Sequence, residues 1–261
     1  MKKKFLIIIS IVLLITIFIC YVLFISTKKI EVKEYKITSS KLNDDYYGLK
    51  IVHFGDIHLN NDSNLNELEN LVDNINLTKP DIVIFTGDLF KNDKIDDDVL
   101  EKTIELLKKI DSKLGKFAIE GDEDNYINYP SIIRKADFTY LNQNYELIYN
   151  SKNPILISDM DSDDLTQENS IYNILIKHKP DDIKNININK YDIIFAGHSH
   201  NGEIKLPFIG PIIKKEGSKT YYDEHYNIND KDLYITSGIG NKLGFRFNNR
   251  PSFNLYRFVN K

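Results

Sequence analysis

The chain has 261 residues, a formal net charge of −4 and a single cysteine, Cys20. This length allows one large domain with a short appendage, and one cysteine excludes a disulfide framework. The acidic balance argues against broad nucleic-acid binding, which requires a basic face.

The first predicted element is an apolar helix at the N-terminus. Residues Phe5–Ile25 contain no charge, glycine or proline over 21 positions. As a helix they would be roughly 31 Å long, about the thickness of the hydrocarbon core of a bilayer. The competing interpretation is a cleaved signal peptide, whose apolar region would be about 7–15 residues before an A-x-A-like site. We therefore expect residues 1–25 to be an N-terminal tail and an uncleaved single-pass membrane anchor.

The next interval, 26–47, is polar and rich in lysine and glutamate. We expect it to be a tether between the anchor and one folded domain over 48–261. Lysines lie on both sides of the apolar segment, so the positive-inside rule does not decide the orientation.

From residue 49 onward, short apolar runs alternate with helical patterns. Apolar residues recur every three to four positions over 65–75 and 99–110, which predicts two amphipathic helices. Strands that alternate with helices in this way begin a parallel α/β domain. Two runs within 140–158, ELIY and PILIS, predict an antiparallel pair, and the runs after 191 are mainly strands.

Five of the predicted strands end in residues that can bind a metal ion. Each is a short run of β-branched or aromatic residues followed by glycine or a polar cluster. In an open α/β sheet, ligands bind at the carboxyl ends of the strands, so we expect the following side chains to converge at one edge of one sheet. They are Asp56, His58, Asp88, Asp122, His178, His198 and His200.

These three carboxylates and four imidazoles form an oxygen-and-nitrogen set suited to Mn, Fe or Zn ions. A lone Gly-Asp is usually a turn and a lone histidine usually a structural residue, but the ordered series of five motifs indicates a metal-dependent hydrolase. A two-metal site holds its ions about 3.5–4 Å apart and needs a shared anionic ligand. Asp88 is the natural candidate for this bridge.

The ordered series resembles the motifs of the calcineurin-like metallophosphoesterases over roughly residues 48–260. The stretch GHSHNGEIKLPFIG, followed by SGIG and FRFNNRP, is similar to the membrane-associated bacterial branch linked to cell-envelope phosphoesters. The resemblance implies an α/β fold of two mixed β-sheets packed as a sandwich and flanked by helices. We accordingly expect a cell-membrane protein whose catalytic domain lies outside the cytoplasm.

The resemblance also implies two divalent metal ions, with manganese as the first expectation. One ion would be held by Asp56, His58, Asp88 and His200, and the other by Asp88, Asp122, His178 and His198. A hydroxide bridging the ions would attack phosphorus in line while the ions neutralise charge on the phosphate oxygens. The expected substrate is a phosphomonoester or phosphodiester, lipid-linked or otherwise part of the cell envelope.

The third motif departs from the family pattern, because Gly121-Asp122-Glu123-Asp124 replaces the usual Gly-Asn-His-Asp. The extra charge of Asp122 makes a two-ion site nominally neutral, which we expect to favour metal retention over phosphate attraction. Glu123 replaces a histidine that assists the leaving group. It is a candidate general acid if neighbouring acids raise its pKa, with Asp124 in a supporting role. The alternative is that this position has lost its catalytic role.

Two further residues are candidates for substrate binding. Asn201 follows the second histidine of the GHSH motif, and Lys205 lies four positions later. Turn chemistry and surface charge are the competing interpretations of these two residues. Arg246 and Arg250 are further candidates for contact with substrate phosphate, although surface charge is the favoured interpretation of each.

Three functions follow from these patterns, and we expect the first. It is a membrane-anchored phosphoesterase whose tether of roughly 22 residues raises the effective concentration of membrane-bound substrates. The second is a catalytically impaired metal- or phosphate-binding protein of the same fold, disarmed at Asp122 and Glu123. The third is a protein phosphatase that acts on envelope proteins.

Overall fold

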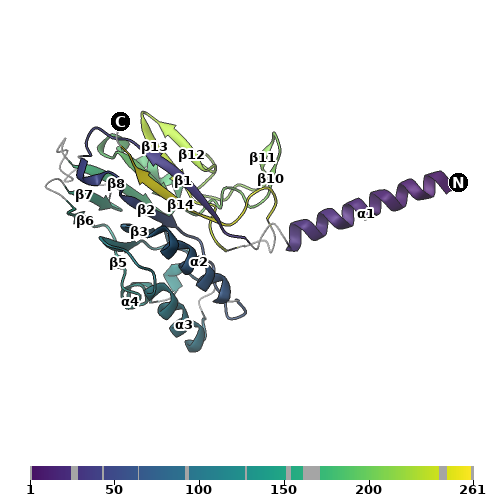
Figure 1. Ribbon diagram of the computed structural model, residues 1–261, viewed down its shortest axis with the longest axis horizontal. Helices are drawn as coiled ribbons and strands as arrows, with labels where there is room; N and C mark the ends of the chain where they lie inside the picture. The colour runs from purple at the N-terminus through teal and green to yellow at the C-terminus, as the bar shows by residue number, and fades with distance from the viewer. Residues whose placement is uncertain are drawn as a thin grey trace.

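Two six-stranded mixed sheets pack face to face, and helices cover the outer face of the first sheet (Figure 1). The computed structural model describes residues 2–24, 29–42, 44–63, 65–91, 94–126, 128–150, 154–160, 171–240 and 246–259. The architecture confirms the predicted α/β class with two mixed sheets.

The first sheet has the order β1-β14-β2-β3-β4-β5. Its strands are β1 (Glu31–Ile37), β14 (Ser252–Phe258), β2 (Lys50–Phe54), β3 (Ile82–Phe85), β4 (Gly115–Ala118) and β5 (Thr139–Tyr140). Strands β2 to β5 are parallel, and β14 is antiparallel to β2 and parallel to β1. The helices on this sheet are α2 (Leu65–Thr78), α3 (Asp97–Lys108) and α4 (Tyr129–Lys135). The first two confirm the predicted amphipathic helices.

The second sheet has the order β12-β13-β9-β8-β7-β6. Its strands are β12 (His225–Ile228), β13 (Lys231–Ile235), β9 (Ile193–Ala196), β8 (Tyr172–Lys177), β7 (Ile155–Ser158) and β6 (Tyr145–Ile148). The four central strands are parallel, and the two edge strands are antiparallel to their neighbours. The pairing of β6 with β7 confirms the predicted antiparallel pair.

The remaining elements of the folded domain are short. The 3₁₀ helices are η1 (Asp44–Tyr46), η2 (Asp124–Tyr126), η3 (Pro180–Asn185) and η4 (Ile188–Lys190). A small antiparallel hairpin, β10 (Lys205–Leu206) with β11 (Gly210–Pro211), stands apart from both sheets.

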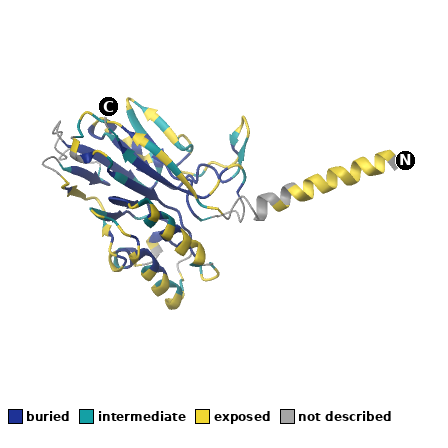
Figure 2. Cartoon of the chain, viewed as in Figure 1, coloured by how far each residue is buried: buried dark blue, intermediate teal, exposed yellow. Residues whose placement is uncertain are grey.

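The core consists of apolar layers on both faces of the first sheet (Figure 2). Along β2, Ile51 belongs to the cluster between the two sheets that includes Phe195, whereas Val52 belongs to the cluster beneath the helices that includes Leu71. Side chains alternate between the faces of a strand, so a strand covered on both faces is apolar at consecutive positions. This is the physical reason for the continuous apolar runs in the sequence.

Part of the predicted polar tether, residues 26–47, belongs to the folded domain. β1 lies beside β14, with Glu31 opposite Ser252 and Ile37 opposite Phe258. Alternate side chains of β1 turn toward the core, while charged residues such as Glu34 remain exposed along the sheet edge. Charges protect an edge strand from pairing with other chains. Because of these charges the segment was predicted to be a polar tether, although alternate positions of β1 face the core as in a strand.

At the N-terminus, α1 (Lys2–Phe24) extends away from the two sheets (Figure 1). The predicted anchor Phe5–Ile25 falls on this helix except for Ile25, which lies outside the described residues. Within the part of the chain that the structure describes, no helix meets the length and apolarity needed to cross a membrane.

Candidate metal centre

The seven predicted metal-binding side chains come from both sheets. Those of the first sheet, Asp56, His58, Asp88 and Asp122, follow β2, β3 and β4. Those of the second sheet, His178, His198 and His200, follow β8 and β9. The prediction of one edge of one sheet was therefore wrong, because the later parallel strands form a sheet of their own. The site lies where the carboxyl ends of the two packed sheets meet.

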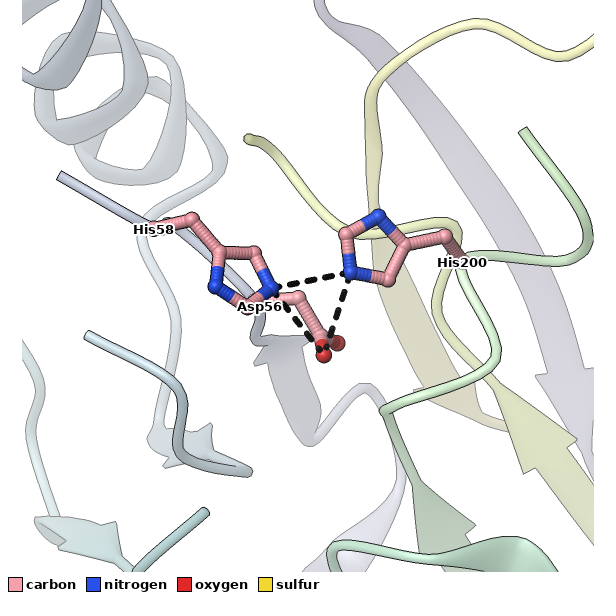
Figure 3. Close-up of side chains that lie close together, drawn as sticks. All are labelled: Asp56, His58 and His200. Carbon is pink, nitrogen blue, oxygen red and sulfur yellow. Dashed lines mark hydrogen bonds and ion pairs between the residues drawn. The ribbon is translucent and has the colours of Figure 1, made fainter. Parts of the chain in front are cut away.

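The first group of donors consists of Asp56, His58 and His200 (Figure 3). The Nε2 atoms of His58 and His200 are 3.0 Å apart. Asp56 Oδ1 lies 3.5 Å from His200 Nε2 and 4.0 Å from His58 Nε2. All three side chains are buried, so their donor atoms face one small volume shielded from solvent.

The second group consists of Asp88, His178 and His198. His178 Nε2 lies 3.4 Å from Asp88 Oδ2 and 3.2 Å from His198 Nδ1. Asp122 adjoins this group, with Oδ2 3.4 Å from His198 Nδ1. Asp88 Oδ2 also lies 3.5 Å from His58 Nε2, so Asp88 stands between the two groups.

Each imidazole is oriented through the ring nitrogen that faces away from the donor groups. A partner on that nitrogen fixes the tautomer and leaves the other nitrogen as an acceptor, as in protein metal sites. The four contacts are His58 Nδ1 to Glu123 Oε2 (2.9 Å), His178 Nδ1 to the Thr86 carbonyl (2.7 Å), His198 Nε2 to the Glu216 carbonyl (2.6 Å) and His200 Nδ1 to Glu203 Oε1 (2.9 Å).

The backbone at these residues lies in the left-handed region, which non-glycine residues rarely adopt. The φ angles are 53° at Asp56, 58° at Asp88 and 64° at His198. Hydrogen bonds stabilise this conformation: the His198 N–H donates to both carboxylate oxygens of Asp56, at 2.9 and 3.0 Å. Strained backbone of this kind clusters at functional sites.

The loops after β3 and β4 approach each other closely at Gly87. This residue has a φ of 87°, and a Cβ on it would lie 2.3 Å from the Gly121 nitrogen. A side chain at position 87 would force Asp88 away from the loop that carries Asp122. Glycine is therefore required here for the two loops to meet.

Electrostatically, the buried carboxylates require positive charge nearby. Burial alone would raise the pKa of Asp56, but the neighbouring His200, His178 and His58 outweigh it and hold this pKa well below its usual value. Burial alone would lower the pKa of His178, but Asp88 outweighs it and raises that pKa to about 10. Buried charges are normally paired or bound to metals. The donor set, oxygen and nitrogen without sulfur, fits divalent ions such as Mn, Fe or Zn.

In the third motif, Asp124 is buried and Glu123 is partly exposed. Asp124 accepts N–H groups of Asp88 (2.7 Å), Leu89 (2.9 Å) and Gly121 (2.8 Å). It therefore joins the loops after β3 and β4, and burial raises its pKa to about 7. Glu123 is partly exposed, and its carboxylate contacts His58 while its N–H donates to Asp88 Oδ1 at 2.9 Å. Glu123 thus orients a predicted ligand, and its role as general acid stays a prediction.

Lys179 was not among the predicted site residues. Its Nζ lies 2.8 Å from Asp122 Oδ1, and this hydrogen bond raises the pKa of Lys179. The negative charge of Asp122 is therefore balanced by a cation that the predicted charge balance omitted. The available signal was its position directly after His178 in the sequence.

Two other residues support His200. Glu203, three positions later, is buried against its imidazole. Arg246 was interpreted as a surface charge, but it is fully buried, and burial lowers its pKa to about 10. Its guanidinium donates to the carbonyls of Ser237 (2.7 Å) and Gly238 (3.2 Å) and lies 3.4 Å from His200 Nδ1.

The predicted substrate-binding residues lie beside this site in different settings. Asn201 is fully buried, and Lys205 is paired with Asp223 at the root of the β10–β11 hairpin. A polar cavity of about 270 Å³ opens next to Asp122 and His178. The polar side chains that line it include Tyr140, Asn142, Asp159, Lys177, Lys179 and Asp182.

A sandwich of two mixed sheets, with two groups of metal donors at its strand ends, places the chain in the class of metal-dependent hydrolases. The sequence model of the calcineurin-like phosphoesterases matches residues 49–202, and the chain belongs to this family. The prediction of the family is thereby confirmed.

Known proteins with similar sequences include metallophosphoesterases of several bacteria. The uncharacterized metallophosphoesterase YkuE of Bacillus subtilis (strain 168) is 28% identical over 252 residues, covering 90% of this chain and 88% of YkuE. The UDP-2,3-diacylglucosamine pyrophosphatase LpxG of Chlamydia trachomatis is 23% identical over 283 residues, covering 81% of this chain and 84% of LpxG. The solved structure of TT1561 from Thermus thermophilus aligns with a TM-score of 0.49 and 10% identity, over 74% of this chain and 90% of TT1561.

Proposed function

We propose that this chain is a membrane-anchored, two-metal phosphoesterase that hydrolyses a phosphomonoester or phosphodiester of a lipid-linked cell-envelope substrate. The observation that carries this proposal is the position of Asp88. Its Oδ2 lies 3.5 Å from His58 Nε2 and 3.4 Å from His178 Nε2, so one carboxylate oxygen joins the two donor groups. A shared anionic ligand is what a two-metal hydrolase needs.

The proposed ligand sets are those that the family resemblance implies. Asp56, His58, Asp88 and His200 would hold one ion, and Asp88, Asp122, His178 and His198 the other. When bound, the ions would supply positive charge against the phosphate oxygens and lower the pKa of water for attack on phosphorus.

The chain itself supplies orientation and charge. The carboxylates of Glu123 and Glu203 each contact the outer nitrogen of a histidine, at His58 and His200, which favours a proton there and leaves the inner nitrogen to bind a metal. Lys179 adds a cation beside Asp122. This favours an active enzyme over the disarmed binding protein, because the charge difference from the family pattern is compensated. Glu123 is retained as the candidate general acid.

Two observations support a lipid-linked substrate and a membrane location. In the sequence, Phe5–Ile25 is an uncharged apolar run of 21 residues, a length typical of candidate membrane spans. The relative LpxG is named for the pyrophosphate of an acylated sugar nucleotide, UDP-2,3-diacylglucosamine. We propose that the catalytic domain lies outside the cytoplasm.

The test uses the purified full-length chain supplied with Mn, Fe or Zn and assayed on generic mono- and diesters. Asp88→Asn and His198→Ala should each lower metal content and reduce hydrolysis by more than roughly 100-fold. Loss of a residue that only supports a metal ligand typically costs about 10- to 100-fold, and loss of a ligand should cost more. His225→Ala is the control, because His225 is an exposed histidine paired with Asp232 at a sheet edge. Wild-type metal content and rate in Asp88→Asn would refute the proposal.

A further inference from the structure

The β10–β11 hairpin exposes a cluster of large apolar side chains. Phe208, Ile209, Ile212 and Ile213 have exposed fractions between 52% and 109%, with Phe208 fully exposed at the tip. They fall within six consecutive positions on an element that neither sheet covers (Figures 1 and 2). Single exposed apolar residues are ordinary, but a contiguous group marks a surface that binds something.

The turn at the tip places phenylalanine where local folding disfavours it. The Ile209 N–H donates to the Leu206 carbonyl at 3.3 Å, Pro207 is the second residue and Phe208 has a φ of 65°. This is the pattern of a type II turn, whose third position normally takes glycine or asparagine. Phe208 is therefore a bulky residue in the left-handed region whose side chain is fully exposed.

The charged side chains within the segment 204–215 are all lysines, although Lys205 is paired with Asp223. Lys205, Lys214 and Lys215 lie in the segment 204–215, which contains no acidic residue, although the whole chain has a net charge of −4. An apolar tip with a basic rim matches a bilayer that has acyl chains below anionic headgroups.

The root of the hairpin is joined to the metal centre. Lys215 Nζ donates to the His198 carbonyl at 3.2 Å, and the carbonyl of the next residue, Glu216, accepts from the His198 ring. On the other side of the hairpin, Glu203 contacts His200. A Cβ on Gly202 would lie 2.1 Å from Pro211 Cβ, so the root is tightly packed. The root of the hairpin is therefore packed against the loop that carries the candidate ligands His198 and His200.

We propose that residues 206–213 insert into the surface layer of a lipid bilayer, as a membrane contact separate from α1. The hairpin projects at the end of the domain from which α1 extends (Figure 1), so both can meet one bilayer. Insertion would present the metal centre to lipid headgroups. The proposal rests on the proposed function only for the delivery of a lipid-linked substrate.

The experiment uses the absence of tryptophan from the chain, which makes one introduced tryptophan an unambiguous reporter. Phe208→Trp is placed in the full-length chain with vesicles of phosphatidylglycerol and phosphatidylcholine that carry brominated acyl chains. Its emission should shift to the blue and be quenched several-fold more strongly than that of Tyr149→Trp. Tyr149 is the matched control, because it is an exposed aromatic residue next to β6, far from the hairpin in Figure 1.

Equal quenching in the two variants would overturn the proposal. A blue shift that grows with protein concentration, without quenching by brominated lipid, would also overturn it. The hairpin would then contact a second copy of the chain and not the bilayer. Phe208→Ser with Ile209→Ser should lower hydrolysis of a phosphoester lipid in vesicles several-fold and leave a water-soluble ester unaffected. Wild-type rates on both would refute delivery by the hairpin. Quenching does not depend on turnover. A chain that is inactive on every ester but quenched at position 208 would therefore refute the proposed phosphoesterase function and leave the proposed membrane insertion standing.

Discussion

Replacing Lys179 with methionine should weaken phosphate binding at the metal centre and leave every proposed metal ligand in place. Lys179 Nζ lies 2.8 Å from Asp122 Oδ1, and the other oxygen of Asp122 lies 3.4 Å from His198 Nδ1. The Lys179 ammonium group therefore contacts Asp122, and Asp122 in turn contacts His198 of the second donor group. Methionine preserves much of the side-chain volume and removes the charge.

The expected size of the effect follows from distance and exposure. With an effective dielectric constant of about 40, between surface and bulk values, a unit charge roughly 7 Å from a phosphate contributes about 1 kcal/mol. The two side chains are 33% and 40% exposed, so solvent and salt reduce this contribution. We therefore expect Lys179→Met to raise KM for a simple phosphomonoester by roughly two- to fivefold.

The assay is steady-state kinetics at low and high salt, with metal content measured on the same samples. Asp122→Asn should lower KM but bind metal more weakly, because it leaves Lys179 unbalanced and removes an anionic donor. The double variant should return KM toward the wild-type value, since both charges are then absent. Lys184→Met is the control, because Lys184 is an exposed lysine that forms an ion pair with Asp181, 3.1 Å apart, on η3. An unchanged KM in Lys179→Met, or a double variant whose KM stays at the Asp122→Asn value, would refute the reasoning.

Three other predictions concern the ligand shell, the core and the anchor. Glu203→Gln should lower metal affinity by roughly 10- to 100-fold in a metal titration, because it weakens the contact that fixes the His200 tautomer, whereas the surface variant Glu224→Gln should not. Burial lowers the pKa of His53 to about 3, below its unfolded value, so its neutral form stabilises the fold above about pH 6.5 and this stability is lost as the pH falls. The free energy of unfolding should therefore fall between pH 7 and pH 5, and in His53→Asn this fall should be smaller by about 2 kcal/mol in urea titrations. An equal fall in both proteins would show that His53 does not cause it. Because apolar burial is insensitive to ionic strength, Phe5–Ile25 should keep the chain in membranes through salt and carbonate washes, and release of the intact chain would exclude the anchor.

The sequence was most informative where local pattern and chemistry coincide. The run before Asp88 is apolar at every position because β3 is covered on both faces, and the aspartate follows where the strand must end. The same reasoning located the strands before Asp56 and His198. It did not reveal that these strands lie in different sheets, since an apolar run carries no information about its neighbours.

Tertiary pairing accounts for the remaining differences. Lys179 and Glu203 are ordinary charged residues in the sequence, and their contacts with Asp122 and His200 depend on how the loops fold together. Arg246 is an extreme case, because a buried guanidinium requires several carbonyl acceptors that only the folded loop provides. β1 was hidden for another reason: its charged residues suit an exposed edge as well as a linker.

Stepwise titration of Mn into the metal-free, full-length chain, with bound metal and ester hydrolysis followed together, is the most direct test of the two-metal centre. We predict that hydrolysis rises as a second ion binds and that Asp88→Asn loses both the second ion and the activity, because Asp88 joins the two donor groups. Full activity in the metal-free chain, or an Asp88→Asn variant that binds two ions and hydrolyses the ester at the wild-type rate, would contradict it.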